Sequence, residues 1–129
     1  MPATATAIEI FALWVSPTGT FRLLDWDMVT TPQHALSCGT AQDVSLAPEL
    51  AMWTDQDAIW LRRPSNDPAS EVLRAYRPHP GLRFGDVVFT GATDPGADAV
   101  RGLTEDQVLT LVDLYLLRVN APMPGAQCR

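Results

Sequence analysis

Arginines are concentrated in one segment of this chain, where together they could bind an anion. Residues 58–83 hold five of the nine arginines and only two acids, a charge of +3, whereas the remainder holds four arginines and thirteen acids, a charge of −9. A guanidinium group binds phosphate or carboxylate through two parallel hydrogen bonds. The segment therefore predicts an anion-binding site formed by four of its arginines. They are Arg62, Arg63, Arg74 and Arg77.

The chemistry of this segment suits two kinds of partner, a nucleotide-like small molecule or an acidic protein. Backbone amides at the start of a helix near Asp67 to Ser70 would add donors for the same anion. The simpler alternative is that the arginines pair with the chain's own surplus of acids. Both interpretations stay open at the level of the sequence.

The glycine-rich stretch from Asp86 to Gly102 does not have the pattern of a known ligand loop. A phosphate loop of the Walker type needs a lysine, and the chain has none. Gly91, Gly96 and Gly102 are five and six residues apart, which does not fit a dinucleotide fingerprint, and the acids lack the alternation of a calcium loop. Residues 91–102 are therefore predicted to be a mobile surface connection of about a dozen residues.

Residues for catalysis or metal binding do not cluster in the sequence. There is no G-x-S-x-G nucleophile motif, and His34 and His79 lie in different segments without neighbouring ligands. Cys38 and Cys128 are too few to suggest a disulfide framework. We expect no catalytic residue, no metal and no cofactor.

Net charge and hydropathy limit the class of partner and the location. The formal charge of −6 disfavours direct binding to nucleic acid, which needs a basic face. No stretch reaches the ~18 apolar residues of a membrane span, so a cytoplasmic protein that does not enter membranes is expected. The sequence leaves open whether the protein forms a homo-oligomer. The use of arginine with no lysine indicates a GC-rich genome.

The order of predicted elements indicates an α+β fold, with an antiparallel sheet of five or six strands and three helices. Residues 1–121 form one predicted domain, and residues 122–129 a flexible tail. Two strands around the turn "SPTG" form a hairpin, because proline and glycine occupy the favoured turn positions. The expected strands are 8–15, 20–27, 43–54, 58–62 and 87–89, and the expected helices are 31–39, 67–77 and 104–120.

Caps and apolar spacing support the three helices. Thr31 precedes Pro32 at the first helix, with Gly39 as a left-handed end, and Asp67 caps the second. Thr104 and Gln107 have the spacing of a capping box at the start of the last helix. This helix is expected to pack lengthwise on a face of the sheet. Its buried stripe is predicted to contain Val108, Leu111, Val112, Tyr115 and Val119. The tryptophans expected to be largely buried are Trp14, Trp53 and at least one of Trp26 and Trp60.

Several short motifs in a fixed order resemble the domain-of-unknown-function family numbered 3846, short proteins of actinobacterial phages and plasmids. They are "V-x-P-x-G" in the first hairpin, "V-x-L" and "M-W-x-D" in the next strands, "N-x-x-A" from Asn66 to Ala69, and "G-D-V-x-x-T-G" ending at Gly91. The resemblance covers residues 8–91, with "SCGTAQD" departing from the family pattern after the first helix. It implies an accessory protein of a mobile element and supplies no catalytic residues.

These observations predict a non-enzymatic binding module of a phage or plasmid. It would sequester an anionic, nucleotide-like small molecule or a host factor. One alternative is an acidic mimic of DNA that inhibits a host defence enzyme, which would need acids regularly spaced on one face. The other is a small hydrolase of an anionic substrate, which would need a convergent nucleophile or metal.

Overall fold

The structure is a computed structural model that describes residues 8–27, 31–77, 82–94 and 99–120. The predicted tail 122–129, together with His79 and Cys128, lies outside the described residues. Within the described part, no helix is long and apolar enough to cross a membrane.

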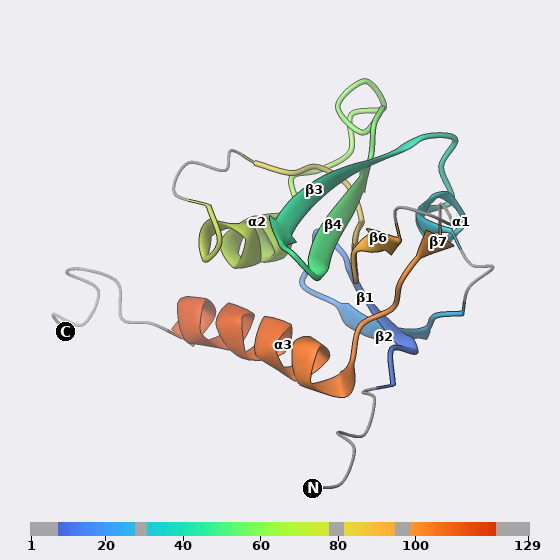
Figure 1. Cartoon of the computed structure of the whole chain (residues 1–129). Helices are drawn as coiled ribbons and strands as arrows, with labels where there is room; N and C mark the ends of the chain where they lie inside the picture. Colours follow the sequence, from blue (N-terminus) through green and yellow to red (C-terminus); the bar gives the residue numbers. More distant parts are fainter. Residues whose placement is uncertain (1–7, 28–30, 78–81, 95–98, 121–129) are drawn as a thin grey trace, which may run out of the picture.

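One antiparallel sheet of five strands forms the centre of the fold (Figure 1). Its order is β2-β1-β5-β4-β3, so β5, the last of these five strands along the chain, lies between two hairpins. Phe89 pairs with Leu13 on one side and with Met52 on the other. The strands are β1 (Phe11–Val15), β2 (Phe21–Asp25), β3 (Ala41–Ala47), β4 (Leu50–Asp55) and β5 (Val87–Thr90). The predicted α+β fold with a five-stranded sheet is confirmed.

Two helices cover one face of the sheet, α2 (Asp67–Arg74) and α3 (Glu105–Asn120) (Figure 1). Side chains alternate between the faces of a strand, and every second residue of the three inner strands enters this core. Leu111 of α3 is 1% exposed, and Val108, Val112 and Tyr115 pack around the core, as the helical spacing predicted. Val119 lies in α3, but its side chain is outside the described part.

The opposite face is covered by the short helix α1 (Pro32–Leu36) and a small two-stranded ribbon. Trp26 is 3% exposed here, and its Nε1 donates to the carbonyl of Val100 at 2.9 Å. Trp14 and Trp53 are half-buried on the same face, and Trp53 Nε1 donates to Thr90 Oγ1 at 2.8 Å. The indole N–H groups of Trp26 and Trp53 are thus paired, as buried polar groups require.

The ribbon replaces the surface connection predicted for the glycine-rich stretch. It consists of β6 (Thr93–Asp94) and β7 (Ala99–Val100), with the residues between them outside the described part. The glycines beside it allow backbone segments to approach closely. A Cβ at Gly91 would lie 2.6 Å from the carbonyl oxygen of Gly102. A Cβ at Gly102 would collide with the carbonyl oxygen of Glu9. The spacing of these two glycines thus serves packing.

Some local predictions were wrong in their details. Residues 58–62 form turns and not a strand. Asn66, not Asp67, caps α2, and Ser37, not Gly39, adopts the left-handed conformation after α1. Elsewhere the caps are confirmed: Thr31 accepts from the amide of His34, and Thr104 and Gln107 exchange the two hydrogen bonds of a capping box.

Candidate binding site

The four predicted arginines make separate contacts. Arg74 lies on α2 and pairs with Glu71 at 3.3 Å, in a partly exposed ion pair. Arg77 follows α2 and donates from Nη2 to the carbonyl oxygen of Ser45 on β3 at 2.6 Å. Arg62 and Arg63 lie on the turns after β4. The arginines are therefore distributed over three places, and anion binding by all four stays a prediction.

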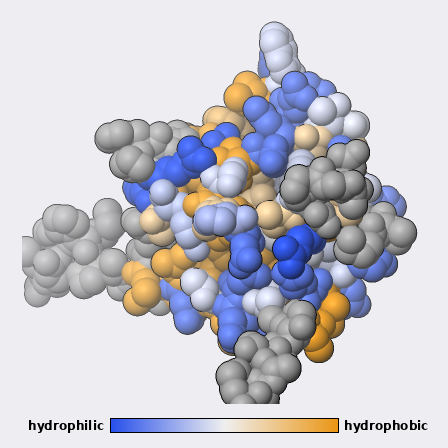
Figure 2. Space-filling model, in the orientation of Figure 1, coloured by the Kyte–Doolittle hydropathy of each residue, from blue (hydrophilic) through white to orange (hydrophobic). Residues whose placement is uncertain are grey.

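Residues 56–63, named the projecting loop here, stand out from the end of the sheet at the top of Figure 1. Figure 2 shows pale and orange atoms beside blue ones on this projection. Ile59, Trp60 and Leu61 are 69%, 87% and 53% exposed. Contiguous large apolar side chains in water are a feature that protein interaction sites share.

Hydrogen bonds hold the projecting loop in one shape. The carboxylate of Asp55 accepts from the amide of Asp57 at 2.9 Å, which starts the turn. The amide of Arg63 donates to the carbonyl of Ala58 at 3.0 Å and closes it. Arg62 adopts φ of 55°, a left-handed conformation that costs a residue with a side chain about 1–2 kcal/mol. The exposed side chains are therefore presented by an ordered turn.

The base of the projecting loop packs against the chain before β5. Ala58 is buried, and its Cβ lies 3.5 Å from the position that a Cβ on Gly85 would take. Cβ and Cγ of Arg63 lie 3.4 Å from that same position. Gly85 has φ of 76°, so glycine is favoured there both for its backbone and for the space.

A pocket of about 440 Å³ opens beside this base, and we name it the sheet-end pocket. It is lined by Ser16, Pro17, Thr18, Leu36, Ser37, Asp55, Arg63, Pro64, Gly85 and Asp86. Burial raises the pKa of Asp86, while the positive charge of Arg63 opposes that rise. With Asp55 also present, the lining has two carboxylates and one guanidinium, a poor match for a phosphate.

Potential nucleophiles near the sheet-end pocket are engaged or deactivated. The hydroxyl of Ser16 lies 2.8 Å from that of Thr18 and accepts from the amide of Thr20 at 3.1 Å, so it stabilises the β1–β2 turn. Burial and the carboxylate of Asp55 raise the pKa of the free thiol Cys38, which keeps it protonated and unreactive. Among the described residues, no group of three or more His, Cys, Asp or Glu could hold a metal.

A second cleft, of about 540 Å³, lies between the β3–β4 turn, α2 and α3. Its floor is formed by Ala47, Pro48, Leu50 and Tyr76. Gln107 of α3 closes one end, where its side-chain amide donates to the carbonyl of Glu49 at 3.0 Å. This cleft contains no arginine.

Sequence reasoning did not assign Arg83 to the site. Arg83 lines a small cavity together with residues of β3, β4 and the projecting loop, and burial together with the charge of Arg77 lowers the pKa of its guanidinium. The proximity of Arg77 and Arg83 was not predictable from a motif. The sequence indicated only that Arg77 and Arg83 belong to the same basic segment, residues 58–83.

Comparison of the chain with family models, with curated proteins and with solved structures gives no match. The resemblance to the family numbered 3846 therefore stays a prediction.

Proposed function

We propose that this protein is a non-enzymatic binding protein that captures a protein partner through the projecting loop. The observation that carries the proposal is the exposure of Ile59, Trp60 and Leu61 on an ordered turn, with Arg62 directly after them. Tryptophan and arginine are the residue types most enriched among those that dominate binding energy at protein interfaces. An ordered turn also loses little conformational entropy when it binds.

The expected partner surface is a hydrophobic pocket with carboxylates at its rim. The apolar side chains would enter the pocket, and Arg62 would pair with the rim. A membrane carrying anionic lipids is the less suitable surface, because the chain has a net charge of −6. The resemblance to phage and plasmid accessory proteins supports a host protein as the partner.

The other candidate functions have weaker support. A nucleotide held by Arg62, Arg63, Arg74 and Arg77 would need side chains that now contact Glu71 and Ser45. Hydrolysis would need an activated nucleophile, and the hydroxyl of Ser16 is used in a turn. Inhibition of a defence enzyme by mimicry of DNA would use the acids, whereas the exposed group described above is apolar and basic.

The proposal is tested with Trp60→Ala and, as a matched control, Leu117→Ala on α3, whose side chain is 69% exposed. The wild type, Trp60→Ala and Leu117→Ala are each immobilised, and host extract is applied to them. Each host protein that is retained is then purified, and its affinity for the wild type and for the two variants is measured by titration. We expect Trp60→Ala to weaken binding of the true partner about 30-fold or more, the loss of about 2 kcal/mol typical of a dominant interface residue. Leu117→Ala should leave it unchanged.

Two results would contradict the proposal. One is that every retained protein binds Trp60→Ala as tightly as wild type. The other is binding of the wild type to vesicles containing anionic lipid, abolished by Trp60→Ala, which would assign the projecting loop to a membrane. Because Trp60 is exposed, the thermal unfolding temperature of Trp60→Ala should match wild type and exclude an indirect effect.

A further inference from the structure

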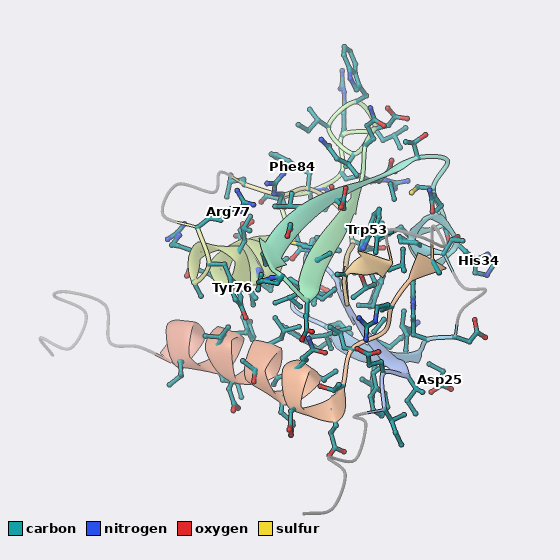
Figure 3. All side chains as sticks on the ribbon, in the orientation of Figure 1. Asp25, His34, Trp53, Tyr76, Arg77 and Phe84 are labelled. Carbon is teal, nitrogen blue, oxygen red and sulfur yellow. The ribbon has the colours of Figure 1, made fainter. Side chains whose placement is uncertain are left out.

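The sheet-end pocket contains charged side chains of both signs. Its lining includes Arg63, from the base of the projecting loop, and Asp86, from the chain just before β5. The end of α1 lines it too. In Figure 3 the labels of His34 and Phe84 mark α1 and the chain before β5. The volume of about 440 Å³ falls within the range of about 300–1,000 Å³ that is usual for small-molecule sites.

Hydrogen bonds fix the two segments that carry these charges side by side. The amide of Gly85 donates to the carbonyl of Pro64 at 2.8 Å. The carbonyl of Gly85 accepts from Nδ2 of the buried Asn66, also at 2.8 Å. The base of the Arg63 side chain packs next to Gly85. The backbones of Arg63 and Asp86, which adjoin this pair of residues, are therefore held close together.

The charged groups of Arg63 and Asp86 are available to a ligand. Neither has an ion-pair partner among the residues that the structure describes, and they do not form an ion pair with each other. They do share one environment, because the charge of Arg63 opposes the rise in the pKa of Asp86 that burial causes. Asp55, the other carboxylate of the pocket, is engaged in a turn, where its Oδ1 accepts from the amide of Asp57 at 2.9 Å.

A ligand with a single charge fits this lining less well than a zwitterion. An anion would meet the carboxylates of Asp55 and Asp86 as well as the guanidinium of Arg63, and a simple amine would meet that guanidinium. A molecule with one negative and one positive group can give each of the two available side chains a partner of opposite charge.

We propose that the sheet-end pocket binds a free α-amino acid with an apolar side chain, as its zwitterion. The ligand carboxylate lies on the guanidinium of Arg63, whose planar fork donates two parallel hydrogen bonds to such a group. The ligand ammonium lies on the carboxylate of Asp86 and stabilises its charged form. Pro17, Leu36 and Pro64 supply apolar lining for the side chain. The site does not use the exposed side chains of the projecting loop, so it is independent of the protein partner proposed above.

The test is an NMR titration of the isotope-labelled protein with three probes at constant pH and ionic strength. L-Leucine carries both charges, L-leucinamide keeps only the ammonium group, and N-acetyl-L-leucine keeps only the carboxylate. We expect the wild type to bind leucine about tenfold or more tightly than either analogue, since each analogue lacks one charged hydrogen-bonded contact. The amide signals of Gly85 and Asp86 should shift as leucine is added.

Two variants remove one charge each. Arg63→Met keeps the apolar stem beside Gly85 but cannot pair with a carboxylate, so it should bind leucine and leucinamide within about twofold of each other. Asp86→Asn loses the negative charge, so it should bind leucine and N-acetyl-leucine within about twofold of each other. Arg74→Met and Asp113→Asn are the matched controls, because neither residue lines the pocket, and both should keep the selectivity of the wild type.

The proposal is wrong if leucine does not bind at millimolar concentration, or if the wild type binds either analogue as tightly as leucine. Selectivity that survives unchanged in Arg63→Met or in Asp86→Asn also overturns it. If Arg63→Met does not fold, Arg63→Gln, which lacks the charge as well, replaces it with the same expected result. Trp60→Ala should bind leucine as the wild type does, and a loss of leucine binding in this variant would contradict the independence of the two sites.

Discussion

Replacement of Asn66, the N-cap residue of α2, by alanine should strongly lower the stability of the protein. The side chain is fully buried, and its Nδ2 donates to the carbonyls of Val15 and Gly85 at 2.9 and 2.8 Å. Its Oδ1 accepts from the amide of Ala69 at 3.0 Å and caps the helix. Loss of the cap costs about 1 kcal/mol, and each buried carbonyl that loses its donor about 1–2 kcal/mol. The total is about 3–5 kcal/mol.

The assay is urea denaturation followed by tryptophan fluorescence, since Trp26 is buried and reports on the fold. Thr31→Ala is the matched control, because Thr31 caps α1 through one exposed hydrogen bond to the amide of His34. It should cost about 1 kcal/mol or less. If Asn66→Ala costs no more than Thr31→Ala, the two Nδ2 hydrogen bonds contribute nothing and the reasoning is refuted.

Asn66→Asp separates the cap from the two donations. The carboxylate still accepts from the amide of Ala69, but it faces the carbonyl oxygens of Val15 and Gly85 without a proton to donate. Burial and these carbonyls should raise the pKa of the new carboxyl in the folded state. The stability difference from wild type should therefore be large at pH 7 and shrink as the pH falls through that raised pKa. A pH-independent difference would contradict this electrostatic explanation.

Two further changes test the packing and the sheet-end pocket. Leu111→Ala should lower the free energy of unfolding by about 2–5 kcal/mol, because Leu111 is buried. Asp113→Ala, on the exposed side of α3, should change it little. Equal losses in urea denaturation would mean that the buried face of α3 has been assigned wrongly. Asp86→Asn should be more stable than wild type at pH 7: burial raises the pKa of Asp86, so wild type loses stability as the pH rises through that pKa. The advantage should disappear below the ordinary aspartate pKa of about 3.9, and a less stable Asp86→Asn at pH 7 would show that Arg63 compensates for the burial.

Helix ends, turns and the sheet were predictable because they depend on local chemistry. Thr104 and Gln107 form a capping box at a fixed spacing, and the α3 stripe follows from the helical repeat. Such signals need no knowledge of distant residues. The cap of α2 was misplaced by one residue, because Asn66 and Asp67 are both good capping residues and only the contacts with Val15 and Gly85 distinguish them.

The parts of the candidate sites that were missed depend on tertiary structure. The apolar, β-rich composition of "AIWLR" is that of a strand, but backbone hydrogen bonds within residues 55–63, such as that from Arg63 to Ala58, show that the chain turns back instead. Of the two tryptophans Trp26 and Trp60, at least one was predicted to be buried, and it is Trp26 that is buried while Trp60 is exposed. The proximity of Arg77 and Arg83 depends on the path of the chain between α2 and β5, which no motif encodes.

The side chains at the exposed end of the projecting loop are mostly in water and bury little surface in the fold. Ala58 is the buried anchor, and backbone hydrogen bonds close the turn without help from the three side chains beyond it. Polar residues at those positions would keep the same turn and would avoid placing apolar surface in water. Ile59, Trp60 and Leu61 therefore add a risk of aggregation that polar side chains on the same turn would avoid. The proposed partner would bury Trp60 and so remove this apolar surface from water.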